Sequence, residues 1–168
     1  MTQKTVQYEC SPDVNPDSVT FLTEMVGHVP AVIYVFNHQT MSNEYANRSV
    51  GELLGYGPDE VKAMGENFLP TIVHPDDFDY LAEHVGALQS LPTGEQSVSE
   101  YRVIRADGRV VWLRSIEVVF NRSADGSVLR HVGVAFDITT EKQKILDLEA
   151  ENKELTMTLK TSVARKRA

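Results

Sequence analysis

The sequence has one cysteine, Cys10, among its 168 residues. A single thiol cannot form an internal disulfide, and no second cysteine is present to complete a zinc-binding pair. The chain also lacks an apolar run near the roughly 20 residues that a membrane helix needs. Its first ten residues lack the apolar segment of a secretion signal. These absences predict a cytoplasmic protein, or a cytoplasmic piece of a longer one, with no membrane segment in this chain.

The motifs of the common enzyme classes are absent as well. The sequence has no Gly-x-Ser-x-Gly, no His-Glu-x-x-His and no glycine pattern of a phosphate-binding or dinucleotide-binding loop. The histidines, at positions 28, 38, 74, 84 and 131, lack the spacing of metal ligands. We therefore expect neither catalysis nor a metal site in this chain. An acid–base enzyme that uses His131 is the alternative.

Acidic residues outnumber basic ones by 24 to 16, which gives a net charge of −8. A surface of that sign repels phosphate backbones, so nucleic acid is disfavoured as a partner. The hydrophobic fraction of 42% is enough for a packed core. The length fits one domain of ordinary size with an appendage.

The first half of the chain mixes two kinds of period. A polar lead-in over 1–15 precedes a short amphipathic helix over 16–27. A dense apolar run at 31–37 and a shorter stretch at 44–46 are typical of strands. Several short helical segments follow, and the last of them ends before Pro92.

The second half is rich in β-branched residues. Three such stretches occupy 98–105, 110–120 and 128–138. An Asp-Gly pair stands in each of the two gaps between them, which is typical of a hairpin. Two strands, a group of short helices and three more strands indicate an α+β fold, with helices on one face of an antiparallel sheet.

Seven segments, in this order and spacing, resemble a PAS domain of the type that ends in a PAC motif. They are IYVFN at 33–37, YANRS at 45–49 leading to ELLGY at 52–56, PDEV at 58–61, HPDD at 74–77, YRVIRADGRVVWLR at 101–114 and GVAFDIT at 133–139. The resemblance implies a sensory domain over 28–139, with a five-stranded antiparallel sheet and short helices enclosing a pocket. Members of the family sense small molecules, light, oxygen or redox state, or act as dimerising modules.

The family's strand pattern also implies which residues face the pocket. They are Ile33, Val35, Tyr101, Val103, Leu113, Ser115, His131, Gly133 and Ala135. Tyr34 and Phe36 are then expected on the outer face of the sheet. Glu117 falls on the inward phase, which we interpret as the sign of a β-bulge. His131 is the polar group that a ligand would contact, with a purely structural histidine as the alternative.

The sequence leaves the cofactor open. Light-sensing flavin domains of this superfamily need an Asn-Cys-Arg-Phe-Leu-Gln motif, whereas the corresponding region reads GENFLP at 65–70, without the cysteine of a photoadduct. Haem-binding relatives use a histidine on the long helix, where His84 lies near the edge of the apolar stripe. A small metabolite, no ligand at all, haem on His84 or non-covalent flavin are the alternatives.

The end of the sequence predicts a signalling helix over 140–168. Asp137, Ile138 and Thr139 resemble the family's hinge between the last strand and this helix. Thr140 and Gln143 have the spacing of a capping box, which would begin the helix.

A heptad pattern within this helix predicts a coiled coil. Its a and d positions are Ile145, Leu148, Asn152, Leu155 and Leu159. An asparagine at a is stable where it meets its twin in a parallel pair, so we expect a homodimer, with a lone surface helix as the alternative. By analogy with the family, an output domain in cis would be a histidine kinase or a diguanylate cyclase, and a ligand-free dimerisation module is the other interpretation.

Overall fold

The structure is a computed structural model that describes residues 19–47 and 49–167. Its centre is a five-stranded antiparallel sheet with the order β2-β1-β5-β4-β3. The strands are β1 (Val32–Asn37), β2 (Ser42–Ala46), β3 (Gln96–Ile104), β4 (Val110–Arg122) and β5 (Val128–Asp137). Because β1 pairs with β5, the first and last strands of the chain lie side by side in the sheet.

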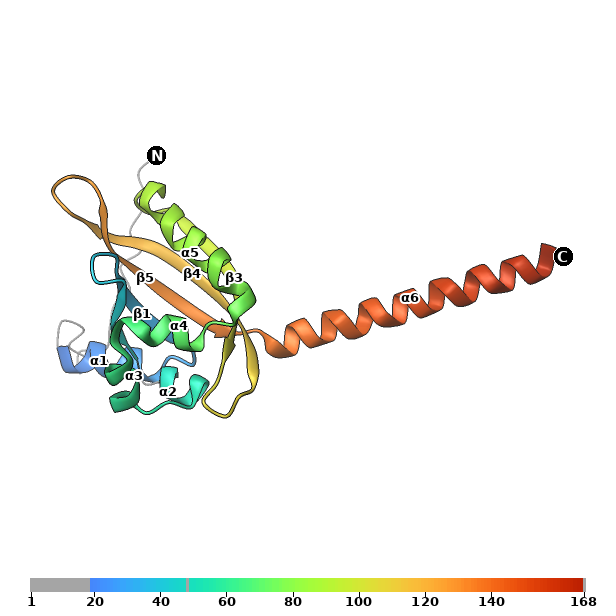
Figure 1. Cartoon of the computed structure of the whole chain (residues 1–168), viewed down its shortest axis with the longest axis horizontal. Coiled ribbons are helices and arrows are strands. Elements are labelled where there is room, and N and C mark those ends of the chain that lie inside the picture. Colours follow the sequence, from blue (N-terminus) through green and yellow to red (C-terminus); the bar gives the residue numbers. More distant parts are fainter. Residues whose placement is uncertain (1–18, 48, 168) are drawn as a thin grey trace, which may run out of the picture.

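The helices lie on one side of the sheet, except at the two ends of the fold. They are α1 (Val19–His28), α2 (Ser49–Leu54), α3 (Pro58–Met64), α4 (Phe68–Ile72), α5 (Phe78–Ala87) and α6 (Thr139–Arg167), with 3-10 turns η1 (Gly65–Asn67), η2 (Pro75–Asp77) and η3 (Leu88–Ser90). Helices α2 to α5 gather over the sheet, and α6 projects away from the domain (Figure 1). This arrangement confirms the predicted α+β fold. None of the described helices is long and apolar enough to cross a membrane.

Both Asp-Gly pairs form the predicted hairpin turns. Gly108 and Gly126 have φ angles of 82° and 90°, a left-handed conformation that favours glycine. The carboxylates of the preceding aspartates stabilise the turns. Asp107 accepts the N–H of Arg109 at 3.0 Å, and Asp125 accepts the N–H of Ser127 at 2.9 Å.

The core lies between the sheet and helices α2, α4 and α5. Its central members are Phe36, Leu54, Phe68, Ile72, Leu81, Val85, Val103 and Leu113. Each side chain of this kind stabilises the fold by roughly 1.5–3 kcal/mol when fully buried. The core therefore fixes the positions of the helices that stand opposite the inward face of β1, β4 and β5.

Helix α6 begins at Thr139, but the predicted capping box does not form. The carboxylate of Asp137 accepts the N–H of Thr139 at 2.9 Å, while the Gln143 amide donates to Asp147 at 2.8 Å instead of reaching back toward Thr140. An aspartate two residues upstream caps the helix better than a residue inside its first turn, because its oxygen faces the unpaired N–H groups. The predicted position of the helix start is confirmed, whereas the predicted capping residues are wrong.

The predicted heptad positions are exposed along α6. Ile145, Leu148 and Leu155 are exposed, and the Asn152 amide donates to the carbonyl oxygen of Leu148 at 2.9 Å. The side chain of Leu159 lies outside the described residues, as do the predicted lead-in over 1–15 and the first residues of the predicted helix at 16–27.

Candidate functional site

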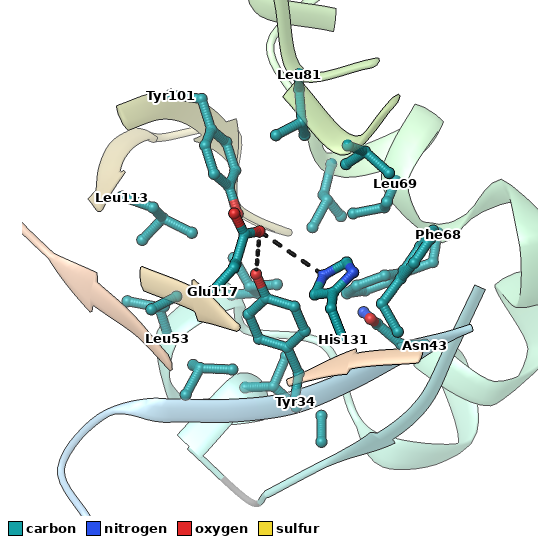
Figure 2. A pocket seen from close by; sticks show the side chains of 18 residues that line it. Tyr34, Asn43, Leu53, Phe68, Leu69, Leu81, Tyr101, Leu113, Glu117 and His131 are labelled. Carbon is teal, nitrogen blue, oxygen red and sulfur yellow. Dashed lines mark hydrogen bonds and ion pairs between the residues drawn. The ribbon is translucent and has the colours of Figure 1, made fainter. Parts of the chain in front are cut away.

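A cavity of about 60 Å³ lies between the sheet and the helices. Its wall is formed by side chains of all five strands and of α2, α4 and α5 (Figure 2). Most of these side chains are apolar. The polar ones are Asn43 of β2, Glu117 of β4, His131 of β5 and two tyrosines, Tyr34 and Tyr101.

The carboxylate of Glu117 is the most deeply buried acid of the described residues, with 2% of the residue exposed. The hydroxyl of Tyr34 donates to its Oε1 at 2.7 Å, and Nε2 of His84 donates to its Oε2 at 2.5 Å. Nε2 of His131 stands 3.7 Å from Oε1. Burial acts to raise the pKa of Glu117, but the hydrogen bonds from His84 and Tyr34 lower it below its ordinary value of 4.5. Glu117 is therefore an ionised group at neutral pH.

Tyr34 reaches Glu117 by crossing the strand between them. Tyr34 of β1 is paired with Gly133 of β5, and Gly133 is paired with Glu117 of β4. A Cβ atom at Gly133 would lie 2.3 Å from Cζ of the Tyr34 ring. Only glycine leaves room for the ring at this position. The contact between Tyr34 and Glu117 therefore depends on residues of three strands, β1, β5 and β4. Burial raises the pKa of Tyr34 well above 10.0, so its hydroxyl keeps the proton that it donates.

A chain of hydrogen bonds leads from Gln89 at the surface to His131, which stands beside this carboxylate. Gln89 Oε1 accepts the N–H of Val128 at 2.8 Å, and the Gln89 amide nitrogen faces Nδ1 of His38 at 3.2 Å. Nε2 of His38 lies 2.9 Å from Nδ1 of His131. In a neutral imidazole one nitrogen donates and the other accepts. Since the Gln89 amide donates to His38, each ring in turn donates through Nε2, and the Nε2–H of His131 points toward Glu117.

Within this series of hydrogen bonds, the imidazole of His131 is neutral. Burial lowers its pKa from the ordinary 6.5 to about 4, against the opposing charge of Glu117. Its ring stacks on Phe36 at a centroid distance of 5.2 Å. His131, predicted from the sequence as the inward polar group of β5, lies in the cavity wall.

The other predicted pocket residues divide into three groups. Tyr101, Leu113 and Ala135 line the cavity together with His131. Val103, Ser115 and Gly133 are on the same face but do not line it. Ser115 Oγ pairs with the Tyr101 hydroxyl at 3.1 Å, and Gly133 lies beneath the Tyr34 ring.

Ile33 and Val35 form the third group, and they were assigned to the wrong face. In the structure Val32, Tyr34 and Phe36 line the cavity, so the alternation of the strand places Ile33 and Val35 on the outer face. Strand β1 is apolar on both faces, so burial preference alone does not select a phase. Glu117 itself pairs regularly with Gly133, and the irregularity of β4 begins farther along the strand, between Val119 and Asn121.

The sequence analysis did not predict the contact between His84 and Glu117. His84 was expected near the solvated edge of α5, yet its side chain is 10% exposed and bonded to Glu117. Taken together, the two residues could have indicated this contact, because each places a polar side chain on the otherwise apolar inward face of its element.

The cavity does not fit the larger cofactors that the sequence left open. Since Nε2 of His84 is taken by Glu117 and the ring does not line the cavity, the geometry does not fit a haem ligand. A cavity of about 60 Å³ is also far below the roughly 300–1,000 Å³ of pockets for large ligands, so a flavin ring does not fit this conformation. Residues 19–47 and 49–167 contain no group of three or more side chains that could hold a metal ion.

The strands of the cavity also hold the start of α6. Ile138 is buried, and its N–H donates to the Trp112 carbonyl at 2.9 Å. The Trp112 N–H donates to Thr139 Oγ1 at 2.9 Å. Nζ of Lys142 lies 2.5 Å from Glu100 of β3 and 4.8 Å from the centre of the Trp112 ring. The predicted hinge residues thus connect α6 to β4 and β5, and Lys142 adds a contact with β3.

Comparison with known sequences identifies the family. The family model described as the PAS fold matches residues 43–135, which is more than half of the chain. The chain belongs to the PAS fold family. A curated relative, the uncharacterized protein y4lL of Sinorhizobium fredii, is 35% identical over 92 residues, 55% of this chain and 10% of that protein. The chain therefore spans about a tenth of the length of this relative.

Solved structures show the same fold. A sensory box histidine kinase/response regulator from Burkholderia thailandensis superposes with a TM-score of 0.63 at 21% identity, covering 81% of this chain and 98% of that one. The N-terminal domain of a diguanylate cyclase with a PAS/PAC sensor from Marinobacter aquaeolei gives a TM-score of 0.53 at 28% identity, covering 67% and 98%. A LOV domain of a blue-light activated histidine kinase from Erythrobacter litoralis gives 0.51 at 18% identity, covering 67% and 99%. The chain is a PAS domain, and its fold resembles those of solved PAS domains from a histidine kinase and a diguanylate cyclase.

Proposed function

We propose that this PAS domain senses a small molecule in the cavity beside Glu117 and passes the signal through α6 to an output domain in cis. The buried carboxylate at the cavity wall is the observation that carries the proposal. Removing an ionised carboxylate from water costs several kcal/mol, which the fold could avoid with an apolar residue of similar size. A carboxylate held at that cost in a cavity wall supports a role in binding.

The connection between cavity and helix supports the relay. Glu117 and His131 lie on β4 and β5, and the same two strands carry Trp112 and the hinge at 137–139. A ligand that moves the Glu117 side chain would shift the pairing of these strands. Since the first turn of α6 is bonded to Trp112, that shift would reorient the helix.

The output requires a second copy of the chain. Exposed apolar side chains at Leu148 and Leu155 would pack across a parallel helix pair, with Asn152 facing its twin. The Asn152 amide bonds its own helix in the single chain and would turn toward the partner. A histidine kinase or a diguanylate cyclase beyond α6 fits the proteins whose PAS domains resemble this one.

A cavity-filling variant tests the ligand site. Ala135 lies in the cavity wall, so Ala135→Val fills part of the space, whereas Ala63→Val adds the same atoms to the exposed surface of α3. Amide NMR spectra recorded with a panel of small amines, alcohols, acids and amino acids are expected to reveal binders. Ala135→Val should weaken them at least tenfold, and Ala63→Val should not. A panel without binders, or binders indifferent to Ala135→Val, would contradict the proposal.

A ligand-free dimerisation module is the second candidate, favoured by the exposed apolar residues of α6. It predicts that the same panel leaves both the spectra and the dimer unchanged. Haem or flavin sensing is tested by the visible absorption spectrum of the purified chain, for which we expect neither a Soret nor a flavin band because of the cavity volume.

A further inference from the structure

We propose that the ligand of the cavity is a small organic cation, a primary alkylammonium ion, whose head group lies between Glu117 and Asn43. This inference rests on the proposed sensing function and names the chemistry of its ligand. Three features of the wall carry it: its charge, the direction of its hydrogen bonds and its aromatic rings.

The cavity wall carries one carboxylate, and no lysine or arginine side chain lines the cavity. Glu117 is ionised, and the polar neighbours that share the wall with it are Tyr34 and His131. Tyr34 keeps its proton, and burial holds His131 neutral at neutral pH. His84 bonds the carboxylate from α5 and does not line the cavity. A cation in the cavity would therefore meet a carboxylate in an environment of low polarity, where charge pairs are strong.

The wall offers hydrogen-bond acceptors and few donors. The Tyr34 hydroxyl donates its hydrogen bond to Glu117, and Nε2 of His131 faces the same carboxylate at 3.7 Å. Oδ1 of Asn43 is buried and has no hydrogen-bond partner among the described residues. A buried acceptor without a partner costs about 1–3 kcal/mol, which a donor on the ligand would offset. An ammonium group has three donors and no acceptor, so it matches this wall.

Aromatic rings complete the wall around these acceptors. Tyr34, Phe36, Phe68 and Tyr101 all contribute to the cavity lining (Figure 2). The faces of such rings attract cations, and the attraction strengthens when water is excluded. An alcohol of the same length would gain the apolar contacts but neither the ring attraction nor the charge pair.

The way into the cavity sets the shape of the ligand. A groove of about 390 Å³ between β2 and α3 shares Asn43, Ala46, Val50 and Phe68 with the inner cavity. The inner space of about 60 Å³ is far below the roughly 300–1,000 Å³ of pockets for drug-sized ligands, and so suits a small head group alone. The alkyl tail would pass Asn43 and Phe68 and lie in the groove. Unbranched chains of a few carbons fit this path.

Three four-carbon probes test the proposal: n-butylammonium, 1-butanol and butyrate. Amide NMR titration of the whole chain at neutral pH measures each dissociation constant. We expect n-butylammonium to bind at about millimolar concentration or tighter, given its few heavy atoms. The alcohol should bind at least tenfold more weakly, and butyrate should give no saturable shift.

Two variants separate the contributions of the head-group contacts. Glu117→Gln keeps the shape of the side chain and should bring the ammonium and the alcohol to within about threefold of each other. Asn43→Leu removes the unpartnered acceptor, and it should weaken the ammonium severalfold with little change for the alcohol. Asn67→Leu, at an exposed position before α4, is the control and should leave all three constants unchanged. If Glu117→Gln does not fold, as judged by loss of amide dispersion, the cation proposal is tested by Asn43→Leu alone.

The outcomes distinguish this inference from the sensing function. Equal affinities for the ammonium and the alcohol, both lost in Ala135→Val, would overturn the cation proposal and keep the ligand cavity. The cation proposal is also overturned, with the ligand cavity kept, if the probes fail while other molecules of the wider panel bind and are lost in Ala135→Val. If neither the probes nor the panel binds, both proposals fall.

Discussion

The hydroxyl of Tyr34 lies 2.7 Å from Oε1 of Glu117, although a whole strand separates the two residues in the sheet. The contact depends on Gly133, which stands between them and has no side chain. Gly133→Ala would place a methyl group where the Tyr34 ring lies. We expect the free energy of unfolding to fall by about 2–3 kcal/mol, because the ring is displaced and a buried carboxylate loses a donor. Urea denaturation at neutral pH measures the change.

Gly86→Ala is the matched control for this substitution. An added Cβ at Gly86 meets no atom within 4 Å beyond its own helix. Gly86 lies in the last turn of α5 without a positive φ angle, so alanine there should stabilise by at most about 1 kcal/mol. Tyr34→Phe keeps the ring and removes only the donor, so it should cost less than Gly133→Ala. Equal stability of the two glycine variants would show that the Tyr34 ring does not occupy the space above β5.

The stability of the domain should fall in mild acid because of His131. Its pKa is about 4 in the folded chain and 6.5 in an ordinary environment, so the unfolded chain takes up the proton first as the pH falls. The stabilising contribution is complete above pH 6.5 and is lost progressively down to about pH 4. The total loss is on the order of 3 kcal/mol. Glu117 acts in the same direction at lower pH, since its lowered pKa gives stability that is lost below about 4.5.

Urea denaturation at intervals between pH 7 and pH 4 checks this assignment. His131→Gln should flatten the dependence between pH 6.5 and 4.5, where Glu117 contributes little. His28→Gln, at an exposed position on α1, should leave the slope unchanged. An identical slope in the wild type and in His131→Gln would assign the acid sensitivity to other groups.

Two leucines of α6 test the proposed helix pair. Leu148 and Leu146 are 58% and 57% exposed in the single chain, but only Leu148 occupies the heptad seam. Leu148→Asp buries a charge at the paired interface, so it should convert a dimer into a monomer. Leu146→Asp changes the same residue type outside the seam and should leave the dimer intact. Sedimentation velocity at high micromolar concentration distinguishes the two.

The order of the elements could be predicted from the sequence because each boundary has a local cause. The Asp-Gly pairs at 107–108 and 125–126 form turns wherever they stand between β-rich stretches, and Pro58 begins a helix in its first turn. The phase of β1 could not be predicted in this way. Ile33 and Val35 are as apolar as Tyr34 and Phe36, so the choice depends on which set meets the helices.

The polar centre of the site depends on contacts between distant segments. Glu117 and His84 each look misplaced on an apolar face, and only their meeting across 33 positions of sequence explains both. The same holds for Gly133, which local pattern alone treats as a gap in β5 and which the structure shows to be the passage for Tyr34. Pairing of this kind becomes visible once the register of three strands is known.

Lys142 should control how firmly the domain holds α6. Its Nζ lies 2.5 Å from Glu100 and faces the Trp112 ring, and Lys142 and Arg114 lower the pKa of Glu100 below its ordinary value. Lys142→Gln removes both contacts and leaves the hinge hydrogen bonds of Trp112 in place. Since an exposed ion pair contributes about 0.2–1 kcal/mol, the amides of the first turn of α6 should exchange with deuterium roughly twofold to fivefold faster.

Lys144→Gln is the control, because Lys144 is an exposed cation on the same helix. It should leave amide exchange at 139–143 unchanged. Equal effects of the two variants would mean that net charge on α6, and not the contact with Glu100, sets the exchange rate. If only Lys142→Gln speeds amide exchange in this turn, the contacts between the domain and α6 are weak. A change at Glu117, farther along β4, would then be enough to alter them.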